Sequence, residues 1–148
     1  MSAEDGWQFV DSNILVYAHD AAAGPRHEMA RALLESLWRS RRGCLSIQVL
    51  QEFYVTVTRK VARPYAPAEA ARIITDLQLW RTHVPAAGDV LAAIEVQTRY
   101  QLSFWEAMIL YSANSLGCSV LWTEDLTAGQ VVGQTTVRNP FKSGDRSH

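Results

Sequence analysis

Short apolar runs alternate along this chain with longer segments in which apolar residues recur at helical spacing. The short runs are bounded by polar or turn-forming residues and predict strands over residues 7–10, 44–47, 83–85, 118–122 and 135–137. The longer segments predict helices over residues 26–42, 48–62, 67–80, 89–101 and 103–117, with Gly43 as the C-cap of the first and Pro67 at the start of the third. Apolar strands that alternate with helices are typical of a parallel sheet covered on both faces. We therefore expect an α/β fold, a three-layer sandwich with a short, mainly parallel central sheet flanked by helices.

Length and composition are those of one folded domain. The 148 residues are too few for two ordinary domains, and with 48% hydrophobic and 20% charged residues the chain can bury a core. No repeat, low-complexity segment or long linker divides it. We expect a single domain over residues 1–141 and an exposed tail over residues 142–148.

The charge, the apolar stretches and the cysteines of the chain exclude several classes of protein. Lys and Arg number 14 and Asp and Glu 15, for a net charge of −1, so no overall positive field attracts nucleic acid or anionic membranes. The apolar stretches are too short to span a bilayer, and the N-terminus lacks the basic start and apolar run of a signal peptide. Cys44 and Cys118 have apolar neighbours and no ligand spacing, which is typical of reduced thiols. We therefore expect a cytoplasmic protein without membrane contacts, and we exclude zinc-finger and disulfide-stapled folds.

Four carboxylates fall where predicted strands end or helices begin. Asp11 directly follows the first strand, and Glu52 lies one turn into the helix after the second. Glu106 lies in the first turn of the helix that Ser103 opens, and Asp125 follows the strand that ends at residue 122. Ligands of open parallel sheets bind outside the carboxyl ends of the strands. The four acids are therefore expected to meet at one end of the sheet.

Each of these acids also has a purely structural explanation. Asp11 or Ser12 could cap a helix, Ser103 to Glu106 has the form of a capping box, and Glu52 could lie on a solvated flank. Two details argue against that set: Glu52 borders the apolar face of its helix, and Asp11 has apolar residues on both sides.

Desolvated carboxylates held near one another repel, which raises their pKa values or requires a cation. A hard divalent ion such as Mg²⁺, bound by a few carboxylates and waters, relieves the repulsion. An ion held in this way can activate water and stabilise charge on a phosphodiester during hydrolysis.

The segments that carry these acids resemble, in order and separation, the PIN-domain family, most closely its VapC branch of ribonuclease toxins. The resemblance covers about residues 9–141, and no single motif is specific by itself, whereas the ordered set is. The matching segments are Phe9-Val10-Asp11-Ser12-Asn13, Gln51-Glu52-Phe53, Ser103-Phe104-Trp105-Glu106-Ala107 and Thr123-Glu124-Asp125-Leu126.

The resemblance implies a Mg²⁺-dependent endoribonuclease, with Mn²⁺ as a substitute, that leaves a 3′-hydroxyl and a 5′-phosphate. It implies that the catalytic residues are Asp11, Glu52, Glu106 and Asp125, of which Asp11, Glu106 and Asp125 hold the metal. Ser12 or Asn13, together with Thr123, would support the metal site. The implied partners are RNA, a small cognate antitoxin whose C-terminal segment occupies the active-site groove, and a second copy of the chain in a homodimer.

Two positions depart from the family pattern or leave it ambiguous. The third acid is commonly Asp in this family, whereas here it is Glu106, whose longer side chain favours contact with the metal through water. Glu124 stands beside Asp125, and the Thr-x-Asp pattern favours Asp125 as the fourth acid.

The remaining chemistry leaves alternatives open. Basic residues near 39–42 and 59–63 suit RNA phosphates as well as the C-terminal dipoles of their helices. Aromatic side chains could stack unpaired RNA bases, and the candidates are Trp38, Tyr54 and Trp105. We expect most of these three to pack in the core instead. The alternative functions are a catalytically silent PIN-like module that binds RNA or protein, and a phosphatase of the haloacid dehalogenase type. The phosphatase chemistry needs a second acid where this chain has Asn13, an amide that cannot shuttle protons.

Overall fold

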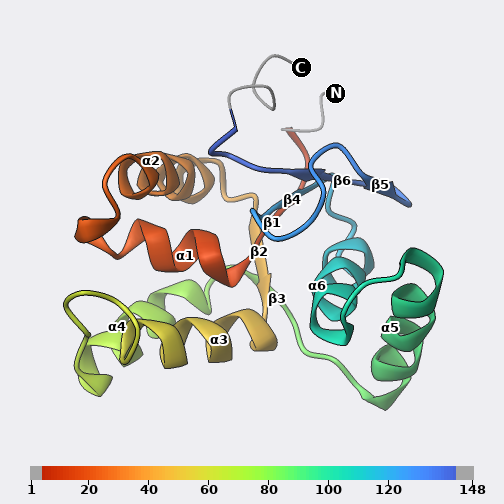
Figure 1. The fold of residues 1–148 in the computed structure, drawn as a ribbon, viewed down its shortest axis with the longest axis horizontal. Helices are drawn as coiled ribbons and strands as arrows, with labels where there is room; N and C mark the ends of the chain where they lie inside the picture. Colours follow the sequence, from red (N-terminus) through yellow and green to blue (C-terminus); the bar gives the residue numbers. More distant parts are fainter. Residues whose placement is uncertain (1–4, 143–148) are drawn as a thin grey trace.

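The computed structural model describes residues 5–142 and has a mainly parallel sheet between two layers of helices (Figure 1). The helices α1 to α4 lie on one side of the sheet, and α5 and α6 lie on the other. The expected three-layer α/β sandwich is confirmed. The strands are β1 (Gln8–Val10), β2 (Gly43–Ser46), β3 (Arg81–His83), β4 (Val120–Trp122), β5 (Val131–Val132) and β6 (Thr135–Arg138). The helices are α1 (Ser12–Ala18), η2 (Ala21–Ala23), α2 (Pro25–Ser40), α3 (Ile47–Val57), α4 (Pro67–Leu77), α5 (Ala87–Tyr100) and α6 (Phe104–Ser115).

The sheet has the strand order β3-β2-β1-β4-β6-β5, and all its pairs are parallel except that of β5 with β6. The central strand β1 pairs with β4 so that Val10 lies opposite Trp122. Residues 11 and 123 therefore leave the sheet side by side, although they are far apart in sequence.

The core lies on both faces of the central strands. Phe9, Leu45 and Leu121 are fully buried, one each from β1, β2 and β4. Because both faces of these strands are covered, every residue of β1, β2 and β4 is buried, and apolar residues stand at consecutive positions instead of alternating with polar ones.

Side chains cap the helices that begin at the carboxyl end of the sheet. Asp11 accepts a hydrogen bond from the Ser12 backbone N–H at the start of α1, and the Ser46 hydroxyl accepts one from the Val49 backbone N–H at the start of α3. Ser103 and Glu106 form a reciprocal capping box at the start of α6. The capping explanations for Asp11 and Glu106 are thus both correct, and they do not exclude a second role.

The prediction that Gly43 caps the first long helix is wrong. Helix α2 ends earlier, with Arg41 in the left-handed conformation at φ 59° as its C-cap. Gly43 instead begins β2, where a Cβ atom would lie 2.6 Å from the Trp80 ring. The glycine is required by this close approach of the indole.

The end of α3 and the extents of two short elements also differ from the prediction. Helix α3 stops at Val57 instead of residue 62, because the Thr58 hydroxyl donates to the Tyr54 carbonyl and the Tyr65 N–H donates to the Val57 carbonyl. The sequence pattern indicated polar helix-start residues at 11–13 but no bounded helix, whereas α1 spans seven residues there. The two-residue strand β5 was also not predicted.

Other expectations concern the thiols, the membrane and the tail. Cys44 and Cys118 are both free and buried. Within residues 5–142, none of the helices has the length and apolar character needed to cross a bilayer. Lys142 is exposed, and the rest of the expected tail, residues 143–148, lies outside the described residues.

Candidate active site

A cavity of about 290 Å³ lies at the carboxyl end of the central strands, and all four predicted acids line it. The strand order explains how three of them meet, because β2, β1 and β4 are neighbours and lead to Glu52, Asp11 and Asp125; Glu106 lies in the first turn of α6. The residues lining the cavity are Asp11, Ser12, Gln48, Glu52, Thr56, Trp105, Glu106, Ile109 and Asp125.

Asp11 is the most buried of the four acids, with 6% of its surface exposed. Its Oδ1 accepts from the Ser12 backbone N–H at 2.7 Å, and its Oδ2 accepts from the Thr123 hydroxyl at 2.8 Å. The pKa of Asp11 is raised from 3.8 to about 7, chiefly by burial; the hydrogen bonds from Thr123 and Ser12 oppose the rise, and the charges of Glu52 and Asp125 contribute to it. The fold therefore holds this carboxylate where its charge is unfavourable without a cation.

Asn13 and Thr123 connect Asp11 to Asp125. The Asn13 amide Nδ2 donates to Asp125 Oδ2 at 2.9 Å and lies 3.5 Å from Asp11 Oδ2. The Thr123 hydroxyl accepts from the Asp125 backbone N–H at 3.0 Å while it donates to Asp11. Asp125 itself is exposed at the mouth of the cavity. The two carboxylates thus share a small polar frame built by α1 and the end of β4.

Glu52 forms a second part of the cavity wall. Its Oε1 accepts from the Ser12 hydroxyl at 2.9 Å, and its Oε2 accepts from the Gln48 amide at 3.1 Å. Gln48 is buried, and its amide also donates to the Trp105 carbonyl at 3.3 Å. The sequence analysis did not identify Gln48, although its position four residues before Glu52 places both on one face of α3.

Glu106 lines the cavity with one carboxylate oxygen already engaged. Its Oε1 accepts from the Ser103 backbone N–H at 3.0 Å as part of the capping box. The other carboxylate oxygen is the one available for contacts in the cavity.

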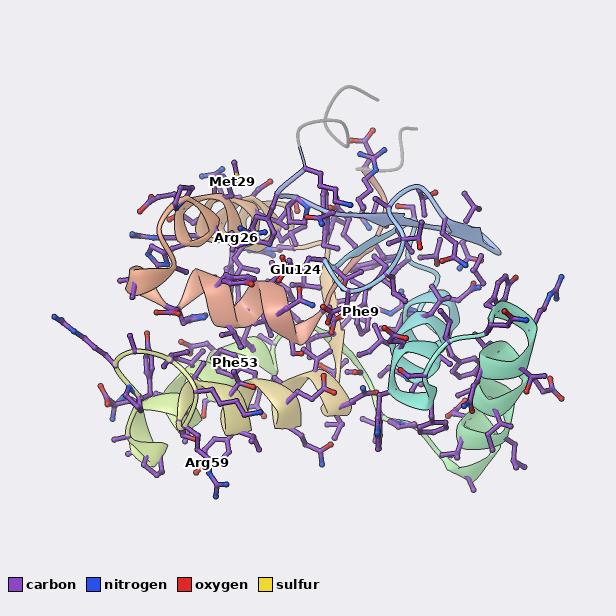
Figure 2. All side chains as sticks on the ribbon, in the orientation of Figure 1. Phe9, Arg26, Met29, Phe53, Arg59 and Glu124 are labelled. Atoms are coloured by element: carbon purple, nitrogen blue, oxygen red, sulfur yellow. The ribbon has the colours of Figure 1, made fainter. Side chains whose placement is uncertain are left out.

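Glu124 is turned away from the cavity. Its carboxylate accepts hydrogen bonds from the Tyr17 hydroxyl and from Arg26 Nε, the latter at 3.3 Å. Glu124 and Arg26 are labelled in Figure 2. The hydrogen bond to Glu124 raises the pKa of Tyr17 to about 12, so the phenol remains a donor at neutral pH. Of the two neighbouring acids, only Asp125 lines the cavity.

The oxygen atoms around the cavity match the chemistry of a hard divalent cation. No Lys, Arg or His is among the lining residues. The buried Asn13 Oδ1 and Gln48 Oε1 have no hydrogen-bond partner among residues 5–142. Within the same part of the chain, no three Asp, Glu, His or Cys side chains lie close enough together to hold an ion. A cation here would therefore be held by fewer direct protein ligands and by waters, the usual form for Mg²⁺.

The prediction that most of the three singled-out aromatic residues pack in the core is wrong. Trp38 is 39%, Tyr54 37% and Trp105 62% exposed. Only Trp105 lies at the acidic cavity. Neither predicted basic cluster contributes to the cavity lining, and Arg41 serves as the C-cap of α2.

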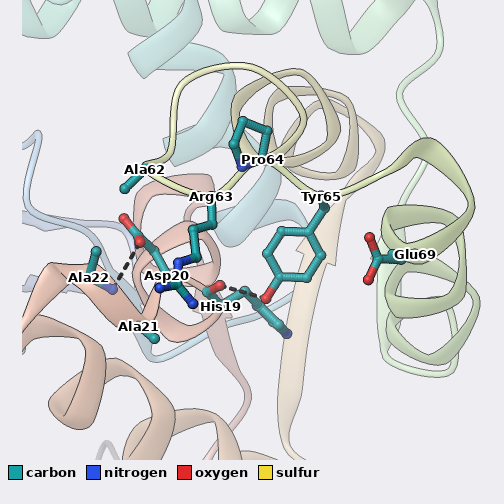
Figure 3. A pocket seen from close by; sticks show the side chains of 9 residues that line it. All are labelled: His19, Asp20, Ala21, Ala22, Ala62, Arg63, Pro64, Tyr65 and Glu69. Atoms are coloured by element: carbon teal, nitrogen blue, oxygen red, sulfur yellow. Dashed lines mark hydrogen bonds between the residues drawn. The ribbon is translucent and has the colours of Figure 1, made fainter.

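A larger cavity, of about 610 Å³, lies beside the end of α1 (Figure 3). Its polar groups serve the local backbone: the Tyr65 hydroxyl donates to the His19 carbonyl, and Asp20 accepts from the Ala22 N–H. Glu69 accepts from the N–H at the start of α4. These groups have structural partners, so we place the candidate site at the acidic cavity.

Comparisons with known proteins agree with the fold. The family model described as PIN domain matches residues 9–131. A comparison with curated proteins finds no match. Among solved structures, the chain is similar to VapC20 from Mycobacterium tuberculosis, described as a sarcin-ricin loop cleaving toxin, with 23% identity, a TM-score of 0.62, and coverage of 80% of this chain and 91% of that one.

Two further structures are similar at lower identity. A toxin–antitoxin complex from Klebsiella pneumoniae has 19% identity and a TM-score of 0.65, with coverage of 91% of this chain and 98% of that one. VapBC2 from Rickettsia felis, bound to a DNA fragment from its promoter, has 18% identity and a TM-score of 0.63, with coverage of 89% and 97%. The family match extends over most of the chain and includes in full all four of the segments that carry the acids. The chain belongs to the PIN domain family.

Proposed function

We propose that this chain is a Mg²⁺- or Mn²⁺-dependent endoribonuclease and the toxin of a type II toxin–antitoxin pair. The observation that carries the proposal is the buried Asp11 carboxylate, which faces Glu52 and Asp125 across a cavity without basic residues. Membership of the PIN domain family supports it. The similar solved structures include a toxin described as cleaving the sarcin-ricin loop and two toxin–antitoxin assemblies.

Asp11 and Asp125 would hold the ion directly, and Glu106 would reach it through water with the oxygen that the capping box leaves free. When bound, the ion would supply an activated water and stabilise the charge that develops on the phosphodiester. It would also neutralise the acidic wall, which otherwise repels a phosphate group.

The surrounding residues orient the acids. The Ser12 N–H and the Thr123 hydroxyl fix the two oxygens of Asp11. The Ser12 hydroxyl and the Gln48 amide fix Glu52, which is placed at the cavity wall to accept a proton from the attacking water. Ser12 thus links the two carboxylates, because its backbone N–H binds Asp11 and its hydroxyl binds Glu52.

The exposed Trp105 indole would stack an unpaired RNA base beside the acids. It lines the cavity and is 62% exposed, so a ring face is open to a ligand. Base stacking on aromatic side chains is the common means of binding unpaired RNA and contributes about 1–3 kcal/mol per base.

The test is cleavage of labelled RNA by the purified chain in Mg²⁺, in Mn²⁺ and in EDTA. We expect cleavage only with the cations, its loss in Asp11→Asn, and normal activity in Asp76→Asn, a matched change at an exposed residue on α4. Trp105→Ala should weaken binding of single-stranded RNA to Asp11→Asn about tenfold, or about 1.4 kcal/mol. Full activity in Asp11→Asn would overturn the proposal, and RNA binding without cleavage by the unmodified chain would indicate a silent binding module.

The proposed homodimer would use the outer face of α5. Val90, Leu91 and Ile94 are 40%, 66% and 44% exposed there, while Ala93 is buried against the domain. Apolar patches of this kind commonly mark protein interfaces. Sedimentation should show a dimer that Leu91→Glu converts to a monomer, and an unmodified chain that sediments as a monomer would refute this part.

The proposed antitoxin would cover the acidic cavity. Its presence should suppress cleavage by the unmodified chain and protect Trp105 from fluorescence quenching by iodide. An inhibitor protein that leaves Trp105 accessible would argue against occupation of this groove.

A further inference from the structure

Glu124 is held by side chains from two separate helices. Its carboxylate accepts from the Tyr17 hydroxyl on α1 and pairs with Arg26, in the first turn of α2, at 3.3 Å. Its side chain is only 20% exposed, whereas that of Arg26 is 51% exposed. An acid in a turn that served only to keep the turn in contact with water would not be held by two side chains in this way.

Aromatic contacts fix the two partners of Glu124 in turn. The rings of Tyr17 and Phe141 meet edge to face with centroids 5.2 Å apart. The Arg26 guanidinium lies 5.1 Å from the Phe141 centroid and 5.8 Å from that of Tyr17. We call Tyr17, Arg26, Glu124 and Phe141 together the Glu124 clamp.

The clamp acts on the same short segment that carries Asp125. Helix α1 contacts this segment at two successive turns: Asn13 donates to Asp125, and Tyr17, four residues later, donates to Glu124. Neighbouring residues held at two points cannot rotate independently of the helix. The two carboxylates are therefore directed to opposite sides, Asp125 to the cavity and Glu124 away from it.

We infer that the Glu124 clamp is a positioning device that sets Asp125 against Asp11 and keeps the Glu124 carboxylate out of the cavity. The inference rests on the proposed function for its effect on catalysis. Without the clamp, Asp125 would keep its hydrogen bonds with Asn13 and Thr123, but the Glu124 carboxylate would lose its contacts with Tyr17 and Arg26, and two adjacent acids would compete for one position.

Two conservative variants test the clamp. Tyr17→Phe removes the hydroxyl and keeps the ring contact with Phe141, and Glu124→Gln keeps an acceptor for Tyr17 but removes the charge that pairs with Arg26. Each should weaken Mn²⁺ binding to the RNA-free protein about fivefold, as measured by isothermal titration calorimetry. Each should lower kcat by a similar factor and leave KM for RNA within about twofold, because the RNA contacts are unchanged. The double variant should bind Mn²⁺ more weakly than either single variant, because one change removes the Tyr17 hydrogen bond and the other removes the ion pair with Arg26.

A second readout does not depend on metal or RNA. Backbone amide hydrogen exchange at residues 123–126 of the metal-free protein should be at least fivefold faster in both variants, with exchange in β1 unchanged. Glu35→Gln is the matched control, because it removes the Arg31–Glu35 pair at 3.4 Å on α2 without touching the segment. It should change neither exchange at 123–126 nor Mn²⁺ affinity.

The outcomes separate this inference from the proposed function. Unchanged exchange at 123–126 in both variants overturns the clamp, and so does an equal loss of Mn²⁺ affinity in Glu35→Gln. If the unmodified chain neither binds Mn²⁺ nor cleaves RNA, the proposed function fails, and the exchange measurement alone then decides whether the clamp positions the segment.

Discussion

Replacing Asp11 by Asn should stabilise the metal-free protein at alkaline pH. The pKa of Asp11 is raised from 3.8 to about 7, chiefly by burial. A group whose pKa is higher in the folded than in the unfolded state contributes less stability as the pH rises through that interval. Asp11 alone should therefore lower the free energy of unfolding by about 4 kcal/mol between pH 4 and pH 8.

Asparagine removes the charge but also one acceptor. Its amide oxygen can still accept from the Ser12 N–H, whereas the Thr123 hydroxyl loses its carboxylate partner. Losing a buried hydrogen bond to a charged group costs about 2 kcal/mol. The expected net gain for Asp11→Asn in EDTA at pH 8 is therefore about 2 kcal/mol, and it should vanish or change sign at pH 4, where Asp11 is protonated.

The assay is urea unfolding in EDTA at pH 4, 6 and 8, followed by circular dichroism. Asp125→Asn is the matched control, because its exposed carboxylate should change the unfolding free energy by less than about 0.5 kcal/mol. Saturating Mn²⁺, at about 100 times its Kd, should stabilise the unmodified chain by about 2.7 kcal/mol and neither variant to that extent. If Asp11→Asn is less stable than the unmodified chain at pH 8 in EDTA, burial of the charged Asp11 carboxylate does not destabilise the metal-free protein.

Three smaller changes test other parts of the fold. Glu106→Ala should lose about 1 kcal/mol of stability and Glu106→Gln almost none in thermal melts, because a Gln amide oxygen can still accept the backbone N–H at the helix start; equal losses would contradict the capping role. Burial lowers the pKa of His83, and this outweighs the opposing effect of the nearby Asp89 carboxylate, so the unfolded chain binds the proton more readily. Asp11 stabilises the fold as the pH falls, so its effect is removed by using the Asp11→Asn variant. In that variant the free energy of unfolding should fall between pH 7 and pH 5, and a rise over this range would contradict the lowered pKa of His83. Gly43→Ala should cost about 2 kcal/mol in urea unfolding, because its Cβ would lie 2.6 Å from the Trp80 ring; an unchanged midpoint would mean that the indole moves freely.

The sheet and the meeting of the acids followed from sequence because both depend on simple patterns. Buried parallel strands are apolar throughout, and the polar residues after them lie at the carboxyl edge wherever the strands become neighbours. Asp11 and Asp125 needed no more than this rule and the pairing of β1 with β4.

The details that sequence did not provide depend on tertiary contacts. A glycine after a helical segment commonly caps it, but the position of the Trp80 indole against Gly43 assigns the glycine to the start of β2. Gln48 is an ordinary helical residue until Glu52 and the Trp105 carbonyl are placed around its amide. The direction of Glu124 depends in the same way on Tyr17 and Arg26, which lie about a hundred positions earlier in the chain.

The position of β4 between β1 and β6 also has a consequence for biosynthesis. Asp11 is synthesised well before Thr123, its hydrogen-bond partner 112 residues later in the chain. Until β4 is made, β1 has an open edge and the nascent polypeptide lacks Asp125 and its frame. The proposed nuclease would therefore have no assembled acidic cavity until β4 and the segment after it have been synthesised, and chains that stop before β4 would lack one of the two acids proposed to hold the ion directly.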